Sequence, residues 1–117
     1  MKKTFTLTCF LLLSCIALTL SSCKKCKNED PSARIINNGT IKASVQIQTS
    51  NGNTVNINNV DPGTASPYSS YAAGQVTFTI KVNSVDYEKT LQISDCYDYD
   101  IAIDSDKNIT SVAIDRN

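Results

Sequence analysis

Apolar and polar side chains alternate with a period of two along most of this chain. The alternation runs through residues 41–48, 55–58, 75–82, 85–93 and 97–103, and shorter stretches of it occur at residues 34–36 and 112–114. Such a period is typical of strands with one buried and one solvated face, whereas amphipathic helices repeat every 3.6 residues or so. No segment after residue 33 shows a helical stripe. We therefore predict an all-β fold, a single antiparallel β-sandwich of about seven strands.

The first expected hairpin has a defined register. A three-residue loop at residues 50–52 pairs Ile47 with Val55 on one face, whereas a two-residue turn would place Ile47 opposite a polar residue. A loop of that type needs left-handed backbone at its last position, where Gly52 stands. The pattern therefore predicts the three-residue loop.

The same parity test predicts a two-residue turn at residues 83–84 and a three-residue hairpin loop at residues 94–96, which pairs Ile93 with Tyr97. Lys89 falls on the dry face of its strand. A bulge or an edge strand would explain it, because an inward lysine protects an edge from pairing with another chain.

Residues 61–74 are not strand-like. This stretch has two prolines, two glycines and two tyrosines, Tyr68 and Tyr71. A loop this long in a small domain is usually a crossover between sheets or a functional loop. The two tyrosines are candidate ligand-binding residues, and the alternative is that one or both pack into the core.

Composition narrows the chemistry. The chain has 117 residues and neither His nor Trp. The missing His removes the usual general base and the commonest metal ligand. From Pro31 onward there are six basic residues against nine acidic ones, so the folded part is mildly acidic, which argues against nucleic-acid binding. We expect no enzyme, no cofactor and no metal site.

One acidic stretch resembles the opening of a calcium loop. Asp104, Asp106 and Asn108 follow a D-x-D-x-N spacing, but Ile109 stands at the sixth position, where that loop needs Gly. The strand alternation also continues past it. We therefore expect a hairpin turn rich in Asp and Asn.

Residues 1–22 have the organisation of a secretory signal peptide. Lys2 and Lys3 form a positive start, residues 5–20 are uncharged and mostly apolar, and small residues precede Cys23. The alternative is a transmembrane helix, because residues 4–22 are 19 uncharged positions. Seven of those positions are Ser or Thr, which favours the signal peptide.

The end of this leader, Leu20-Ser21-Ser22-Cys23, resembles the lipobox of bacterial lipoproteins. The resemblance implies that signal peptidase cuts between Ser22 and Cys23, and that Cys23 carries a diacylglyceryl anchor in the membrane. Leader and tether are similar to those of Bacteroidota lipoproteins, which implies a place in the cell envelope at the outer membrane. Whether the protein faces the periplasm or the cell surface is left open.

These boundaries divide the chain into a signal peptide (residues 1–22), a lipidated flexible tether (residues 23–32) and a β-sandwich domain (residues 33–117). Lys24, Lys25 and Lys27 lie in the tether, where they either attract anionic head groups or are simply solvated. Cys26 and Cys96 remain outside the leader and the lipobox. In an oxidising compartment they form either a disulfide or two free thiols.

A second resemblance rests on three short segments: Arg34 to Asn37, Ser66 to Tyr68, and Ala73-Gly74 followed by Phe78. Together they look like a family of bacterial envelope modules of unknown function, which implies an immunoglobulin-like or transthyretin-like sandwich. Tyr68 and Tyr71 in their long loop lead us to expect a non-enzymatic binding or adhesion module for a glycan or an envelope protein. The alternative is an accessory subunit of a larger outer-membrane complex.

Overall fold

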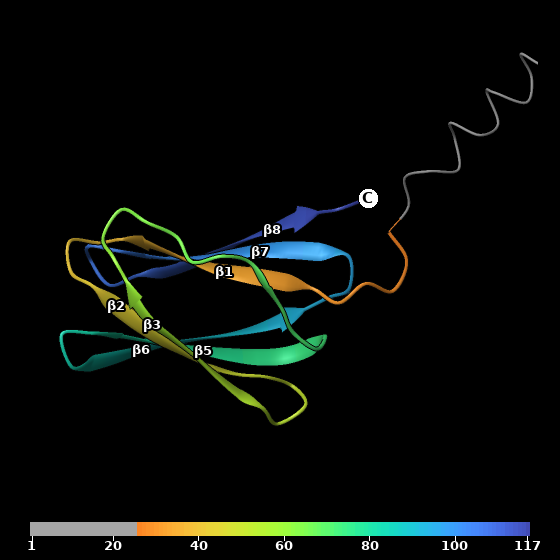
Figure 1. Ribbon diagram of the computed structural model, residues 1–117, viewed down its shortest axis with the longest axis horizontal. Helices are drawn as coiled ribbons and strands as arrows, with labels where there is room; N and C mark the ends of the chain where they lie inside the picture. Colours follow the sequence, from red (N-terminus) through yellow and green to blue (C-terminus); the bar gives the residue numbers. More distant parts are fainter. Residues whose placement is uncertain (1–25) are drawn as a thin grey trace, which may run out of the picture.

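The structure, a computed structural model, describes residues 26–117, which form two stacked β-sheets (Figure 1). The strands are β1 (Ser32–Asn38), β2 (Ala43–Gln48), β3 (Thr54–Val60), β4 (Ser69–Ser70), β5 (Gly74–Val82), β6 (Val85–Ile93), β7 (Tyr97–Asp104) and β8 (Ile109–Asp115). Sheet A has the order β4-β1-β7-β8, and sheet B has the order β3-β2-β5-β6. The predicted all-β sandwich is confirmed, with the two-residue β4 added to the seven expected strands. Cys23 and the cleavage position after Ser22 lie outside the described residues.

The core lies between the two sheets and is filled by the inward positions of their strands. Ile35 and Ile101 of sheet A, and Phe78 and Ile80 of sheet B, are completely inaccessible to solvent. Burying one such side chain stabilises the fold by about 1.5–3 kcal/mol. The period-two alternation therefore both forms the strands and supplies the surface that joins the sheets.

Both hairpins of sheet B have the predicted register. Ile47 pairs with Val55 across β2 and β3, and Gly52 has a φ of 86° in the loop between them. Val82 pairs with Val85 across the turn at residues 83–84. β6 is an edge strand and its pairing with β5 is regular, so the half-buried Lys89 is explained by the edge and not by a bulge.

The prediction of a hairpin loop at residues 94–96 is wrong. β6 belongs to sheet B and β7 to sheet A, so this loop is a crossover and Ile93 does not pair with Tyr97. Parity could not reveal this, because both residues point toward the core in either arrangement. One pair of neighbours is also parallel: β1 runs beside β7, with Ile35 next to Ile101.

The expected dry face of residues 112–114 is wrong as well. Asp100 of β7 faces outward, and its partner on β8 is Val112, so Val112 and Ile114 point away from the core. They are 58% and 42% exposed. Ile41 is also 40% exposed, because β2 begins only at Ala43 and residues 39–42 carry the chain from one sheet to the other.

The segment before β1 is docked on the sandwich, which differs from the flexible tether expected for residues 23–32. Cys26 forms a disulfide with Cys96, with 5.7 Å between their Cα atoms. The Cys96 amide donates to the carbonyl of Glu29 at 2.9 Å, and Pro31 is fully buried. The folded unit therefore begins at Cys26, within the segment that its polar composition suggested to be free.

Candidate functional site

The outer face of sheet B carries a shallow groove. Its volume is about 270 Å³, and it crosses β2, β3, β5 and the start of β6, with a lining of Ser44, Val45, Gln46, Asn56, Asn58, Thr79, Lys81 and Asp86. Seven of these eight side chains are polar. Side chains alternate between the two faces of a strand, so the positions that do not point into the core point to solvent. The polar side chains of the groove occupy these outward positions.

Strand register brings the polar side chains of the groove together. Gln46 of β2 pairs with Asn56 of β3 on one side and with Thr79 of β5 on the other. Asn58 lies further along β3, next to a bulge at which Asn59 adopts a φ of 61°. Bulges bend a strand and redirect its side chains. The result is a row of primary amides across neighbouring strands.

The three amides of this row are free to bind. Within residues 26–117 the side chains of Gln46, Asn56 and Asn58 make no hydrogen bond to another described residue, whereas Thr79 approaches Glu88 at 3.4 Å. Each amide offers both a donor and an acceptor. The groove can therefore exchange several neutral hydrogen bonds with a ligand.

Charges at the groove nearly cancel. Lys81 lies 3.9 Å from Asp86, and Glu88 stands beside Thr79 on the same face. Both partners of the Lys81 pair are more than half exposed, so the pair contributes little to stability. The groove has one positive and two negative groups in or beside it, which does not favour an anionic ligand.

Tyr68 lies on the other side of the molecule, on the outer face of sheet A. Its ring is stacked on the guanidinium of Arg34 at 4.7 Å, and its hydroxyl donates to Asp100 at 2.5 Å. Arg34 also donates to both carboxylate oxygens of Asp100, at 2.8 and 3.2 Å. These contacts pin the loop after β3 to β1 and β7.

Arg34, Tyr68 and Asp100 form a cluster, the Tyr68 cluster, whose contacts shift the pKa values of its own members. The hydrogen bond from Arg34 holds the pKa of Asp100 below its ordinary value. The hydrogen bond that Tyr68 donates to Asp100 raises the pKa of Tyr68, because ionised Tyr68 would have no proton to donate. The side chains of Arg34, Tyr68 and Asp100 already form hydrogen bonds and a stacking contact with one another. We therefore assign this cluster the role of positioning the loop and not that of a binding site.

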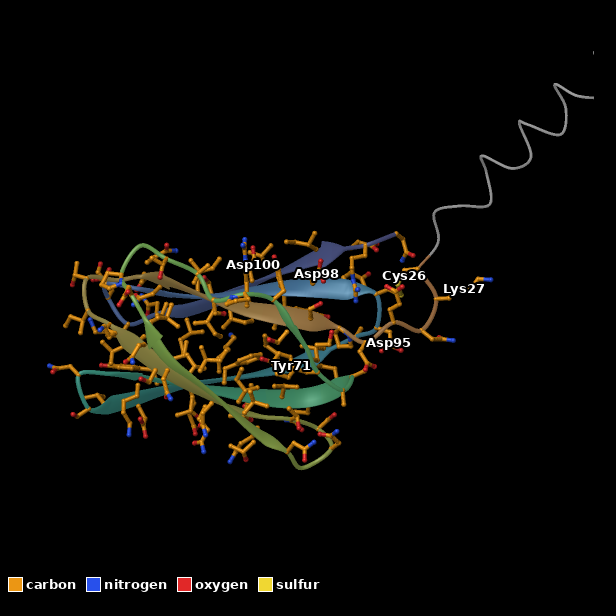
Figure 2. The ribbon with its side chains drawn as sticks, viewed as in Figure 1. Cys26, Lys27, Tyr71, Asp95, Asp98 and Asp100 are labelled. Atoms are coloured by element: carbon orange, nitrogen blue, oxygen red, sulfur yellow. A yellow bond between two sulfur atoms is a disulfide. The ribbon has the colours of Figure 1, made fainter. Side chains whose placement is uncertain are left out.

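Tyr71 does not join Tyr68. Only 5% of Tyr71 is exposed, and it lies between the two sheets (Figure 2). Burial raises the pKa of its hydroxyl. The two predicted ligand-binding residues therefore lie on different sides of sheet A, and the alternative of packing into the core holds for Tyr71.

The end of the sandwich next to the tether is held by covalent and polar contacts. The Cys26–Cys96 bridge lies there (Figure 2), and Arg116 donates to the carbonyl of Asp30 at 2.6 Å and to the carboxylate of Glu29 at 3.3 Å. The Cys26 amide donates to the side chain of Asn117 at 3.0 Å. The Arg116 amide also donates to the carbonyl of Cys96 at 3.0 Å, so both ends of the described chain are fastened to the crossover loop.

The acidic turn between β7 and β8 binds its own backbone. One carboxylate oxygen of Asp104 accepts from the amides of Asp106 and Asn108, each at 2.9 Å. This is the expected hairpin turn. In the part of the chain that the structure describes, no group of three acidic, Cys or His side chains is placed to hold a metal ion.

A further surface, which the sequence pattern missed, lies along β8. This strand is the edge of sheet A, so its outer row of backbone groups has no strand partner among the described residues. Val112 and Ile114 are exposed on its outer face. The sequence pattern placed the apolar side chains of residues 112–114 in the core, so it did not predict this exposed surface.

The groove of sheet B was also missed. Its amides stand at the solvent positions of strands, where polar residues need no explanation, and only the register shows that they meet. The available signal is that residues 44–58 carry Asn, Gln, Ser or Thr, and no charge, at their outward positions.

Among residues 26–117 there is no helix long and apolar enough to cross a membrane. No family model matches the chain, and no curated protein matches it. Among solved structures, it is similar to one described as the NMR structure of a protein from Eubacterium rectale. The TM-score is 0.49 and the identity 14%, over 73% of this chain and 88% of that one.

Proposed function

We propose that this chain is a lipid-anchored, non-enzymatic binding module of the bacterial cell envelope, and that it binds through the outer face of sheet B. The observation that carries the proposal is the groove, in which Gln46, Asn56 and Asn58 present amides with no partner among the described residues. Each primary amide both donates and accepts hydrogen bonds, so the three together can recognise a polar ligand.

Membrane attachment is the second part of the proposal, and it rests on the resemblance of Leu20-Ser21-Ser22-Cys23 to a lipobox. Cys23→Ala should abolish metabolic labelling with a radioactive fatty acid and leave the precursor uncut. Labelling and processing of this variant at the wild-type level would refute the anchor. Cys26→Ala is the matched control, and it should be labelled normally.

The binding function is tested by retention on envelope material. Full-length protein in detergent should co-sediment with isolated cell envelopes, and a variant with Gln46, Asn56 and Asn58 all replaced by Ala should be largely lost from the pellet. The matched control replaces Gln75 and Gln92 by Ala, because these residues lie on the same face, paired with each other but outside the groove. Equal retention of both variants would remove the groove from the proposal.

The alternative, an accessory subunit of a membrane complex, is favoured by one observation. Val112 and Ile114 are exposed on an edge strand, and edges of this kind pair with other chains. Crosslinking in intact cells should then join β8 to another envelope protein, and Val112→Lys should prevent it. Val85→Lys is the control, because Val85 is similarly exposed, at 50%, but lies on β6, an edge strand of the other sheet.

A further inference from the structure

We infer that the groove of sheet B binds a neutral, hydroxyl-rich glycan chain. The inference rests on the proposed binding function and names the ligand class of the same site. The lining suits sugar hydroxyls, each of which both donates and accepts a hydrogen bond. Gln46, Asn56 and Asn58 offer the same pair of functions, and Ser44 and Thr79 add two hydroxyls.

The charges of the groove argue against anionic polymers. Nucleic acids and anionic glycans are held by clusters of unpaired Arg and Lys. Here the single cation of the groove, Lys81, is paired with Asp86 at 3.9 Å, and Glu88 adds a second negative charge beside it. A negatively charged chain would be repelled, whereas a neutral one would not.

Shape favours a chain over a small molecule. The groove is shallow, and its volume of about 270 Å³ is just below the range of about 300–1,000 Å³ found for small-molecule pockets. A second hollow of about 210 Å³ lies beside β3 and shares Asn58 with the groove. The two hollows therefore adjoin at the edge of sheet B, where a chain can continue from one into the other.

Affinity for one site should be low. No aromatic side chain lines the groove, so there is no ring for a sugar to stack on. A few neutral hydrogen bonds, each with a small net contribution, lead us to expect a dissociation constant on the order of 1 mM. Many copies held in one membrane would raise the effective affinity through multivalency.

The test is a titration of full-length protein in detergent, followed by NMR of the side-chain amide groups. The probes are the neutral polysaccharide fraction of the cell envelope and, for comparison, heparin as an anionic glycan. Signals of Gln46, Asn56 and Asn58 should shift with the neutral fraction and not with heparin. The triple Ala variant should bind at least tenfold more weakly, whereas the Gln75 and Gln92 double variant should bind like the wild type.

Three outcomes would overturn the inference: shifts confined to sheet A, a preference for heparin, or no shift with the neutral fraction. Retention on whole envelopes separates this failure from that of the proposed function. Periodate cleaves the vicinal diols of sugars, so it should abolish groove-dependent retention, while protease treatment should not. If protease abolishes retention and periodate does not, the groove binds a protein, and the glycan inference fails while the binding function stands.

Discussion

Asn37 shows how much one buried polar side chain can organise. It is 1% exposed, and its amide donates to the carbonyls of Ile41 and Val60 at 2.8 and 2.9 Å. Its side-chain oxygen accepts from the amide of Gly39 at 2.9 Å. One residue of β1 thereby ties the turn after it to the end of β3, in the other sheet.

Asn37→Asp should destabilise the protein by about 2–4 kcal/mol at pH 7, because the carboxylate cannot donate to the two carbonyls and places a charge in the core. Urea denaturation measures the effect. Asn38→Asp, at the exposed neighbouring position, should change stability by less than about 0.5 kcal/mol. Equal effects of the two substitutions would contradict the role assigned to Asn37.

The Tyr68 cluster predicts how stability depends on pH. The pKa of Tyr68 is raised in the folded protein, so its contribution is complete below about pH 10, the unfolded value, and is lost as pH rises through the folded pKa. The pKa of Asp100 is lowered, so its contribution is present above about pH 4 and is lost as pH falls through the folded pKa.

Tyr68→Phe should therefore be less stable than the wild type at pH 7, and the difference should shrink above pH 10. Urea denaturation at pH 7 and pH 11 measures both values. A difference that stays constant over this range would show that the Tyr68 hydroxyl does not depend on its proton for the contact with Asp100.

At the scale of the element, the turn between β5 and β6 has backbone strain that a glycine substitution would relieve. Asn83 and Ser84 have φ values of 52° and 67°, as a two-residue turn of this hand requires. Glycine adopts such backbone without the penalty that other residues pay in the left-handed region.

Ser84→Gly should therefore stabilise the protein by about 0.5–1 kcal/mol, measured as the shift of the urea midpoint at constant slope. Ser105→Gly is the control. Ser105 lies in the turn before β8 but outside the left-handed region, so glycine there should be neutral or destabilising. Stabilisation at both positions would point to an effect on the unfolded chain instead.

Element type and hairpin register could be predicted where the partners are neighbours in sequence. Ile47 with Val55 and Val82 with Val85 were recovered, because a loop of given length allows one register and parity selects it. The β6–β7 crossover and the facing of β8 could not be recovered, because they depend on which sheet receives the next strand.

At the scale of the molecule, the Cys26–Cys96 bridge changes how the domain is attached. The bridge closes a separation of 70 residues, which corresponds to roughly 4 kcal/mol in the chain-entropy account. Only Lys24 and Lys25 lie between the proposed anchor at Cys23 and the bridge. Three residue steps span at most about 11 Å, so the tethered end of the sandwich should stay close to the membrane.

The bridge also predicts an unusual response to protease. In a variant with Lys24 and Lys25 replaced by Gln, trypsin can cut the chain after Lys27, which is exposed. Cys26 stays on the lipid side of that cut but is joined to Cys96 on the domain. Cut protein should therefore remain on vesicles until dithiothreitol is added.

The matched control keeps Lys24 and replaces Lys25 and Lys27 by Gln. Trypsin then cuts between the lipid and Cys26, and the domain should leave the vesicles without reductant. Release of the first variant by trypsin alone, with the cut verified on a reducing gel, would show that the bridge is absent from the native protein.

The sequence by itself determined the strand content and the local hairpins, since alternation and loop length act over a few neighbouring residues. It also predicted the lipid anchor, which remains a prediction. Only the tertiary structure decided which faces point inward on β8, that Tyr68 and Tyr71 separate, and that Gln46, Asn56 and Asn58 form one groove. These features depend on which strands become neighbours. The packing of the whole core decides that, and it involves segments far apart in the sequence, so no local pattern predicts it.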